Sequence, residues 1–176
     1  MKQHSRLWQW AGFAIVTLLG TILHFLFDWT GGSLMVAPFS GVNESTWEHM
    51  KLLFWPLFLF GLFQWYFFRD RGNFWFIKLA QTLLGLLLIP VLFYTYNGIF
   101  GHSPDWVNIT IFYLAAAGAF LLEWQLLRWD RPSTCYPELP LGAMVLIAIA
   151  FVAFTFFPPR IPLFQDPVTG FRGICG

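Results

Sequence analysis

Charged side chains are scarce in this sequence. Only 11% of its 176 residues are Asp, Glu, Lys or Arg, whereas a typical soluble domain carries about 25%. At the same time 57% of the chain is hydrophobic and 21% is aromatic. So few charged groups cannot cover the surface of a soluble globule, and the composition therefore favours an integral membrane protein.

Cysteine is almost absent, and neither sign of charge dominates. Cys135 and Cys175 lie far apart in the sequence and form no CxxC or zinc-finger pattern. The formal net charge is +1, and no basic patch indicates nucleic acid as a partner. The sequence therefore gives no sign of a cysteine-based metal site or of nucleic-acid binding.

What the chain has instead is a series of long apolar blocks. A stretch of about 18 or more apolar residues predicts a membrane-spanning helix, because lipid offers no partner for backbone N–H and C=O groups. We predict an all-α polytopic membrane protein, a compact bundle of five transmembrane helices forming a single domain over residues 1–176. The predicted spans are about 7–27, 51–68, 74–96, 106–127 and 141–157, and the proline-rich residues 158–176 are predicted to form an irregular tail on the outer face.

The basic residues predict an orientation. Seven of the ten fall at one set of span ends, and the positive-inside rule places that set in the cytoplasm. The N-terminus is then cytoplasmic and the C-terminus lies outside. Cys135 and Cys175 fall on opposite sides of a hydrocarbon core about 30 Å thick, so we expect no disulfide between them. The seven basic residues on the predicted cytoplasmic side are Lys2, Arg6, Arg69, Arg71, Lys78, Arg128 and Arg131. The three on the predicted outer side are Lys51, Arg160 and Arg172.

The polar residues concentrate just before the second span, in the stretch "VNESTWEHMK" (42–51). Ser45 and Glu48 have the spacing of a capping box, in which Ser caps the helix and Glu reaches back to the N-cap N–H. Acidic residues at a helix start also offset the macrodipole. This structural interpretation accounts for Ser45 and Glu48, but capping does not require His49.

Ionisable residues from three segments fall on the predicted outer side. His24 and Asp28 are four residues apart and share one face at the end of the first span. Ionisable residues at membrane depth are costly, so their default interpretation is functional. We predict ligand binding by His24, Asp28, Asn43, Glu44, Ser45, Lys51, Asn97 and Asp105, catalysis by His49 and Glu48, and metal ligation by His24, His49 and His102.

Two classes of function fit this pattern. In the first, which the sequence favours slightly, an outward-facing pocket binds or moves a small or lipid-like ligand, or supports a partner membrane complex. The charges then form an ion network of Glu44–Lys51, Glu48–Lys51 and His24–Asp28. In the second, the protein is a metal-dependent, hydrolase-like membrane enzyme acting on a lipid or isoprenoid, with a divalent ion such as zinc activating water. Expected partners are membrane lipid, a lipid-like ligand, and a second copy or another membrane protein.

The stretches "VNESTWEHMKLLFWP" and "PLFQDPVTG" resemble a family of small multi-pass bacterial membrane proteins of uncharacterised function. The resemblance extends to "LHFLFDWTG" and "FYTYNGIFG" and covers most of the chain. It implies a bacterial cytoplasmic membrane location and a compact multi-helix unit. It implies no reaction, substrate, cofactor or catalytic residue.

Overall fold

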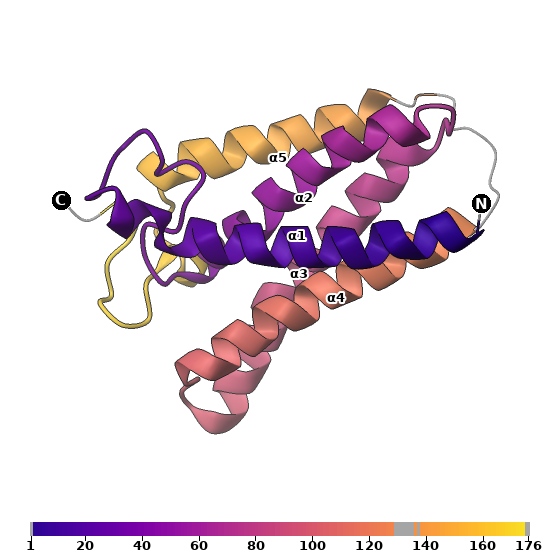
Figure 1. Ribbon diagram of the computed structural model, residues 1–176. Coiled ribbons are helices and arrows are strands. Elements are labelled where there is room, and N and C mark those ends of the chain that lie inside the picture. Colours follow the sequence, from indigo (N-terminus) through magenta and orange to yellow (C-terminus); the bar gives the residue numbers. More distant parts are fainter. Residues whose placement is uncertain (1, 129–135, 137, 175–176) are drawn as a thin grey trace.

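The computed structural model describes residues 2–128, 136 and 138–174, and the side chains from residue 7 onward, and it contains five long helices (Figure 1). They are α1 (Lys2–Trp29), α2 (Thr46–Phe68), α3 (Phe74–Phe100), α4 (Asp105–Arg128) and α5 (Glu138–Phe156), followed by the 3-10 turn η1 (Pro162–Phe164). All five are long and apolar enough to cross a membrane, and the described residues form no strand. The predicted all-α protein with five transmembrane helices is confirmed. Cys135 and Cys175 lie outside the described residues.

The helices reach beyond several predicted spans. The predicted spans follow the apolar residues alone, but a helix continues through polar residues wherever its terminal backbone groups are satisfied. For this reason α2 begins at Thr46 rather than about 51, directly after Ser45, whose hydroxyl accepts the Glu48 N–H at 3.4 Å. Likewise α3 continues to Phe100 and ends at Gly101, which has φ 79° and donates its N–H to the Asn97 carbonyl at 2.8 Å.

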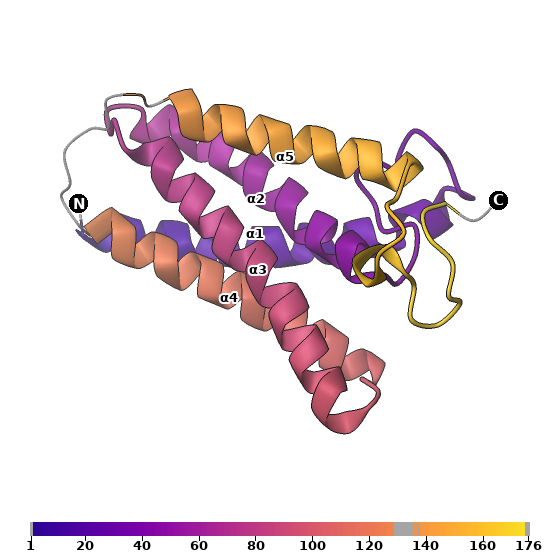
Figure 2. The same ribbon diagram turned by 180° about the vertical axis from the view of Figure 1, so that it is seen from behind.

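Helix α2 lies at the centre of the bundle (Figures 1 and 2). Half of its most apolar window is buried inside the protein, against 22% in α1 and in α5. Leu53, Phe54 and Leu57 are completely or almost completely inaccessible. Because α2 contacts all the other helices, its polar N-terminal turn meets side chains from several segments.

Two glycines let α1 approach its neighbours closely. A Cβ on Gly20 would lie 2.5 Å from the Phe112 ring and 3.0 Å from the Leu52 carbonyl oxygen. That carbonyl lacks its usual helical donor, because Pro56 has no N–H four residues on. A Cβ on Gly12 would meet the Phe60 and Phe120 rings at 2.5 and 2.6 Å. Glycine at both positions therefore sets how close α1 lies to α2 and α4.

The loop 30–45 between α1 and α2 folds back over its flanking helices. The Ser40 hydroxyl donates to the Leu23 carbonyl at 2.5 Å and accepts the Phe27 N–H at 2.8 Å. From α2, the Trp55 indole N–H donates to Pro38 O at 2.9 Å. The loop is thus fixed to both helices.

At the end of the bundle opposite the N-terminus, the α3–α4 connection is separated from the other loops (Figures 1 and 2). The 30–45 loop and the C-terminal tail lie together, with Trp47 packed between Phe151 and Phe164 at ring-centroid distances of 4.5 and 4.6 Å. The connection between α3 and α4 projects away from them in both views. Residues of that connection are therefore separated from those at the start of α2.

Candidate functional site

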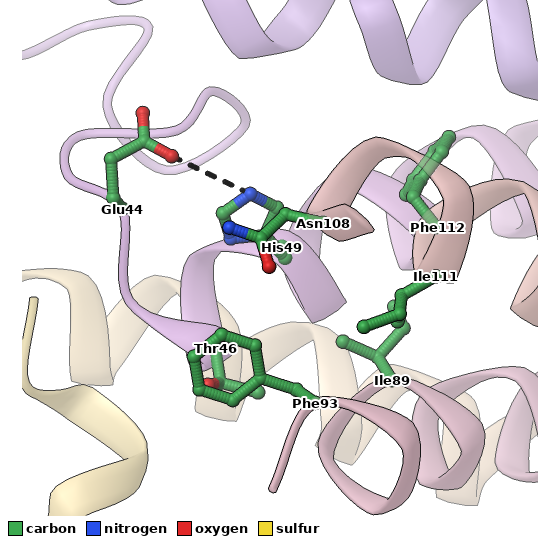
Figure 3. Close-up of a pocket in the computed structure, with 8 residues that line it drawn as sticks. All are labelled: Glu44, Thr46, His49, Ile89, Phe93, Asn108, Ile111 and Phe112. Carbon is green, nitrogen blue, oxygen red and sulfur yellow. Dashed lines mark ion pairs between the residues drawn. The ribbon is translucent and has the colours of Figure 1, made fainter. Parts of the chain in front are cut away.

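Three polar side chains from three successive segments meet at the start of α2. Glu44, from the loop, lies between His24 of α1 and His49 of α2 (Figure 3 shows the Glu44–His49 pair). His24 Nε2 is 3.7 Å from Glu44 Oε1, and His49 Nε2 is 3.6 Å from Glu44 Oε2. The side chains are 30%, 48% and 19% exposed for His24, Glu44 and His49. The cluster is therefore reachable from the surface but rests on the bundle.

The His49 ring is oriented by the backbone. Its Nδ1 lies 3.0 Å from the Ser45 carbonyl oxygen. A carbonyl can only accept a hydrogen bond, so Nδ1 carries the proton and the neutral ring keeps a lone pair on Nε2, the atom that faces Glu44. Histidine ligands of metal ions are commonly held in this way, with the second ring nitrogen bound to a carbonyl or carboxylate.

The spacing of the three groups suits a metal ion. One ligand atom from each residue can be chosen so that all lie within 4.8 Å of one another. Zinc binds His nitrogen and carboxylate oxygen at about 2.0–2.2 Å in tetrahedral geometry, so its ligand atoms lie about 3.4 Å apart. The two His–Glu distances of 3.6 and 3.7 Å are close to this value, and they are longer than a hydrogen bond.

A small cavity lies beside His49 and Glu44 (Figure 3). Its volume of about 10 Å³ has room for about one water molecule. The oxygen of Asn108, from α4, is buried on this cavity without a hydrogen-bond partner among the described residues. Asn108 is not among the site residues predicted from the sequence; the signal for it is a polar amide within an apolar run. The remaining lining residues are Thr46, Ile89, Phe93, Ile111 and Phe112.

Glu48 and Lys51 form a separate, closed network. The Glu48 carboxylate lies 2.5 Å from Lys51 Nζ and accepts the Val42 N–H at 3.1 Å. Lys51 Nζ also donates to Ala37 O at 2.8 Å and to the Thr155 hydroxyl at 2.9 Å. The side chain of Lys51 is 0% exposed and that of Glu48 is 2% exposed. Neither group lines the small cavity, so the structure gives Glu48 and Lys51 the role of joining α2, the loop and α5.

The predicted capping box is present only in part. Ser45 does cap α2, but the Glu48 carboxylate turns to Val42 and Lys51 instead of the Ser45 N–H. The Asn43 side-chain oxygen accepts that N–H at 2.9 Å. Asn43 in turn donates to the Gly173 carbonyl at 2.9 Å, which ties the C-terminal tail to the loop.

The other predicted site residues lie elsewhere. Asp28 is exposed and forms no ion pair with His24 among the described residues; the carboxylate beside that ring is Glu44. Similarly, Glu44 pairs with the two histidines and Lys51 with Glu48. The predicted Glu44–Lys51 and His24–Asp28 ion pairs are therefore wrong within the described part of the chain. The residues predicted from the α3–α4 connection are not brought to the cluster, since that connection diverges: His102 and Asp105 are exposed, and Asn97 donates to Phe93 O and Ser103 Oγ.

Asp166 of the tail adds a carboxylate near the cluster. Burial raises its pKa, but hydrogen bonds from Val168 and Thr169 and from the Glu44 backbone outweigh this effect, so the pKa of Asp166 lies below its ordinary value. The Val168 and Thr169 N–H groups lie 2.7 and 3.2 Å from its Oδ1. Asp166 is therefore an anion that fixes the turn of the tail against Glu44.

A second buried ion pair lies between α3 and α4. The Lys78 ammonium contacts the Glu123 carboxylate and also donates to the Gln81 side-chain oxygen at 2.9 Å. The Gln81 amide donates to the other Glu123 oxygen at 3.1 Å. All three side chains are at most 1% exposed. The pair satisfies itself within the bundle and forms no part of the candidate site.

The sequence as a whole matches a described family over residues 1–174. The chain belongs to the family of unknown function DUF6512. This match confirms the resemblance to an uncharacterised family. No curated protein and no solved structure matches the chain. The geometry of the cluster therefore carries the functional interpretation of this DUF6512 chain.

Proposed function

We propose that this protein is a multi-pass membrane protein that binds a divalent metal ion, best matched by zinc, through His24, Glu44 and His49. The observation that carries the proposal is the arrangement of two imidazoles about one carboxylate, with ligand atoms within 4.8 Å. The lone pair of His49 Nε2 faces a carboxylate oxygen at 3.6 Å. Two acceptor atoms at this distance repel each other unless a proton or a metal cation lies between them.

The size of the cavity favours an ion over a lipid-like ligand. A pocket for a drug-sized molecule holds about 300–1,000 Å³, whereas the cavity beside His49 measures about 10 Å³. The cavity has room for one water molecule, which would be bound to a metal ion held between His24, Glu44 and His49. The unpaired oxygen of Asn108 on that cavity is placed to accept a hydrogen bond from such a water.

The proposed location is a bacterial cytoplasmic membrane, with the metal site on the outer side. The distribution of basic residues supports this orientation, and the resemblance of the sequence to small bacterial membrane proteins supports the location. The site would then take its ion from outside the cell. Binding, holding or passing on the ion is the function that this placement favours.

A second function rests on the number of ligands. Two histidines and one glutamate leave the fourth tetrahedral position open for water, as in catalytic zinc sites. A metal-dependent hydrolase acting on a lipid or isoprenoid headgroup is therefore the alternative. Zinc-loaded protein would be incubated with a lipid extract. Release of a headgroup by the native chain but not by Glu44→Gln would favour the hydrolase, and no release would favour binding alone.

Metal analysis tests the proposed site directly. Protein purified in detergent, stripped with a chelator and exposed to zinc should retain about one ion per chain, measured by elemental mass spectrometry. Glu44→Gln, His24→Ala and His49→Ala should each lower the zinc affinity by at least tenfold, because each removes one of three ligands. His102→Ala is the matched control, since His102 is an exposed histidine outside the cluster.

Three results would contradict the proposal. One is the absence of stoichiometric zinc, cobalt or manganese in the native chain. Another is equal loss of zinc in His102→Ala and His49→Ala, which would assign binding to histidines in general. The third is full retention in Glu44→Gln, a variant expected to fold because that side chain is half exposed.

A further inference from the structure

A groove of about 460 Å³ lies between α1 and α4, away from the metal cluster. Its walls come from the N-terminal half of α1 and the C-terminal half of α4, toward the end of the bundle where the N-terminus lies (Figures 1 and 2). Ala117 is the smallest lining residue. The remaining lining residues are Gln9, Trp10, Phe13, Phe120, Leu121 and Trp124. The volume lies within the range of small-molecule sites.

Among the described residues that line this groove, Gln9 is the one with an amide side chain, and it is 8% exposed. Its amide nitrogen and amide oxygen are both buried without a partner among the described residues. Buried polar atoms are rarely left unpaired, and an unpaired group in a functional protein calls for an unobserved partner. A partner for Gln9 must supply an acceptor for the amide N–H and a donor for the amide oxygen.

A basic residue lies beside Trp124, one of the residues that line the groove. Arg128, the last residue of α4, is exposed, and its guanidinium lies 5.0 Å from the centre of the Trp124 ring. Trp124 itself lines the groove. The neighbouring Arg71 is already bound, because it donates to the Leu127 carbonyl at 3.0 Å. Among the described side chains, Arg128 is thus a cation available to an anionic group beside Trp124 of the groove.

From these contacts we infer that the α1–α4 groove is a binding site for an anionic phospholipid. One acyl chain lies against Phe13, Phe120 and Leu121, and the phosphate contacts Arg128. The Gln9 amide, which is inaccessible in the empty groove, turns toward the groove on binding, and an ester carbonyl accepts its N–H. A hydroxyl of the headgroup or its water donates to the Gln9 oxygen. An apolar helix of a second copy would fill the groove but leave both Gln9 atoms unpaired, so the lipid satisfies more of the site.

Lipid retention measured by native mass spectrometry tests this inference. Detergent-solubilised protein is mixed with equal amounts of phosphatidylglycerol and phosphatidylcholine that carry identical acyl chains. The native chain should retain phosphatidylglycerol at least threefold more often. Arg128→Gln should remove this preference while some lipid is still retained. Gln9→Leu should reduce retention of both lipids, and so should Ala117→Trp, which fills the groove.

The matched control is Arg69→Gln. Arg69 is an exposed arginine at the same end of the bundle that lies over an aromatic ring, Tyr66, but not beside the groove. This variant should keep the preference of the native chain. Gln9→Leu removes an unpaired amide and should fold at least as well as the native chain in detergent, so its loss of lipid cannot be assigned to misfolding.

Several outcomes would overturn the inference. Equal retention of both lipids by the native chain would do so, as would a preference that survives in Arg128→Gln or falls equally in Arg69→Gln. Unchanged retention in both Gln9→Leu and Ala117→Trp would place the lipid elsewhere. A lipid-free dimer that Ala117→Trp converts to a monomer would assign the groove to a second copy.

Discussion

Lys51 Nζ lies 2.5 Å from the Glu48 carboxylate, one turn apart on α2, and both side chains are excluded from the surface. Lys51 also reaches Ala37 in the loop and Thr155 in α5. The pair therefore connects the three segments that surround the start of α2. Because the loop carries Glu44, the position of the candidate metal ligand depends on this buried pair.

Removing one partner of the Glu48–Lys51 pair should destabilise the protein strongly. Glu48→Gln and Lys51→Met should each lower the free energy of unfolding by about 3–5 kcal/mol, because a buried charge is left without its counterion. The double variant should lose less than the sum of the two. Chemical denaturation in detergent measures these changes, with exposed Arg160→Gln as the control. Additive losses in the double variant would show that the two groups act independently.

The Lys78–Glu123 pair should behave in the same way between α3 and α4. Lys78→Met should lower the melting temperature well below that of the control Glu138→Gln, which alters an exposed acidic residue. The reason is that Glu123 and Gln81 would remain buried without the ammonium that both of them contact. If Lys78→Met has the same melting temperature as the native chain, water replaces the ammonium and the predicted loss of stability is wrong.

The predicted orientation can be tested with reporter fusions. A reporter after Gly176 should read as extracytoplasmic, and one within residues 69–73 as cytoplasmic. Burial of Lys78 and Lys51 removes one residue from each predicted side, so six basic residues remain against two. The opposite readings would place the metal site on the cytoplasmic side and leave its geometry unchanged.

Acid should weaken the docking of the tail. The pKa of Asp166 is lowered in the folded chain, so its anion contributes stability that is present above the unfolded pKa and is lost as pH falls through the folded pKa. The native melting temperature should exceed that of Asp166→Asn at pH 6, and the gap should close below about pH 4. Glu44 and His49 face Asp166, so Asp105→Asn, which alters an exposed residue outside the cluster, is the control. A difference in melting temperature between the native chain and Asp166→Asn that does not change with pH would show that hydrogen bonding alone, and not the charge of Asp166, stabilises the tail.

Much of the fold followed from apolar blocks, but the partners in the site did not. The sequence placed His24 and His49 near one end of adjacent spans, and the structure brings both to Glu44. That Glu44 rather than Asp28 contacts His24 depends on the path of the loop, which Ser40 fixes to α1. No periodicity within a helix encodes that path.

Long-range pairing explains the other differences. The position of Lys78 near the start of a span predicts an interfacial cation. In the structure it is paired with Glu123, which lies 45 positions away on α4. His102 and Asp105 were expected to join the site, yet the tilt of α3 and α4 carries their connection away. Such tilts arise from how helices pack against one another, and single-sequence patterns do not specify them.

The Ser45 carbonyl accepts two hydrogen bonds from one residue, the His49 backbone N–H at 3.2 Å and the ring Nδ1 at 3.0 Å. The helical conformation of the first turn of α2 and the orientation of the imidazole therefore depend on the same carbonyl group. The ring cannot turn over without losing one of these bonds, and the turn cannot unwind without releasing the ring. Any cation held by His49 Nε2 would slow amide hydrogen exchange in this turn, which makes the helix start itself a reporter of occupancy.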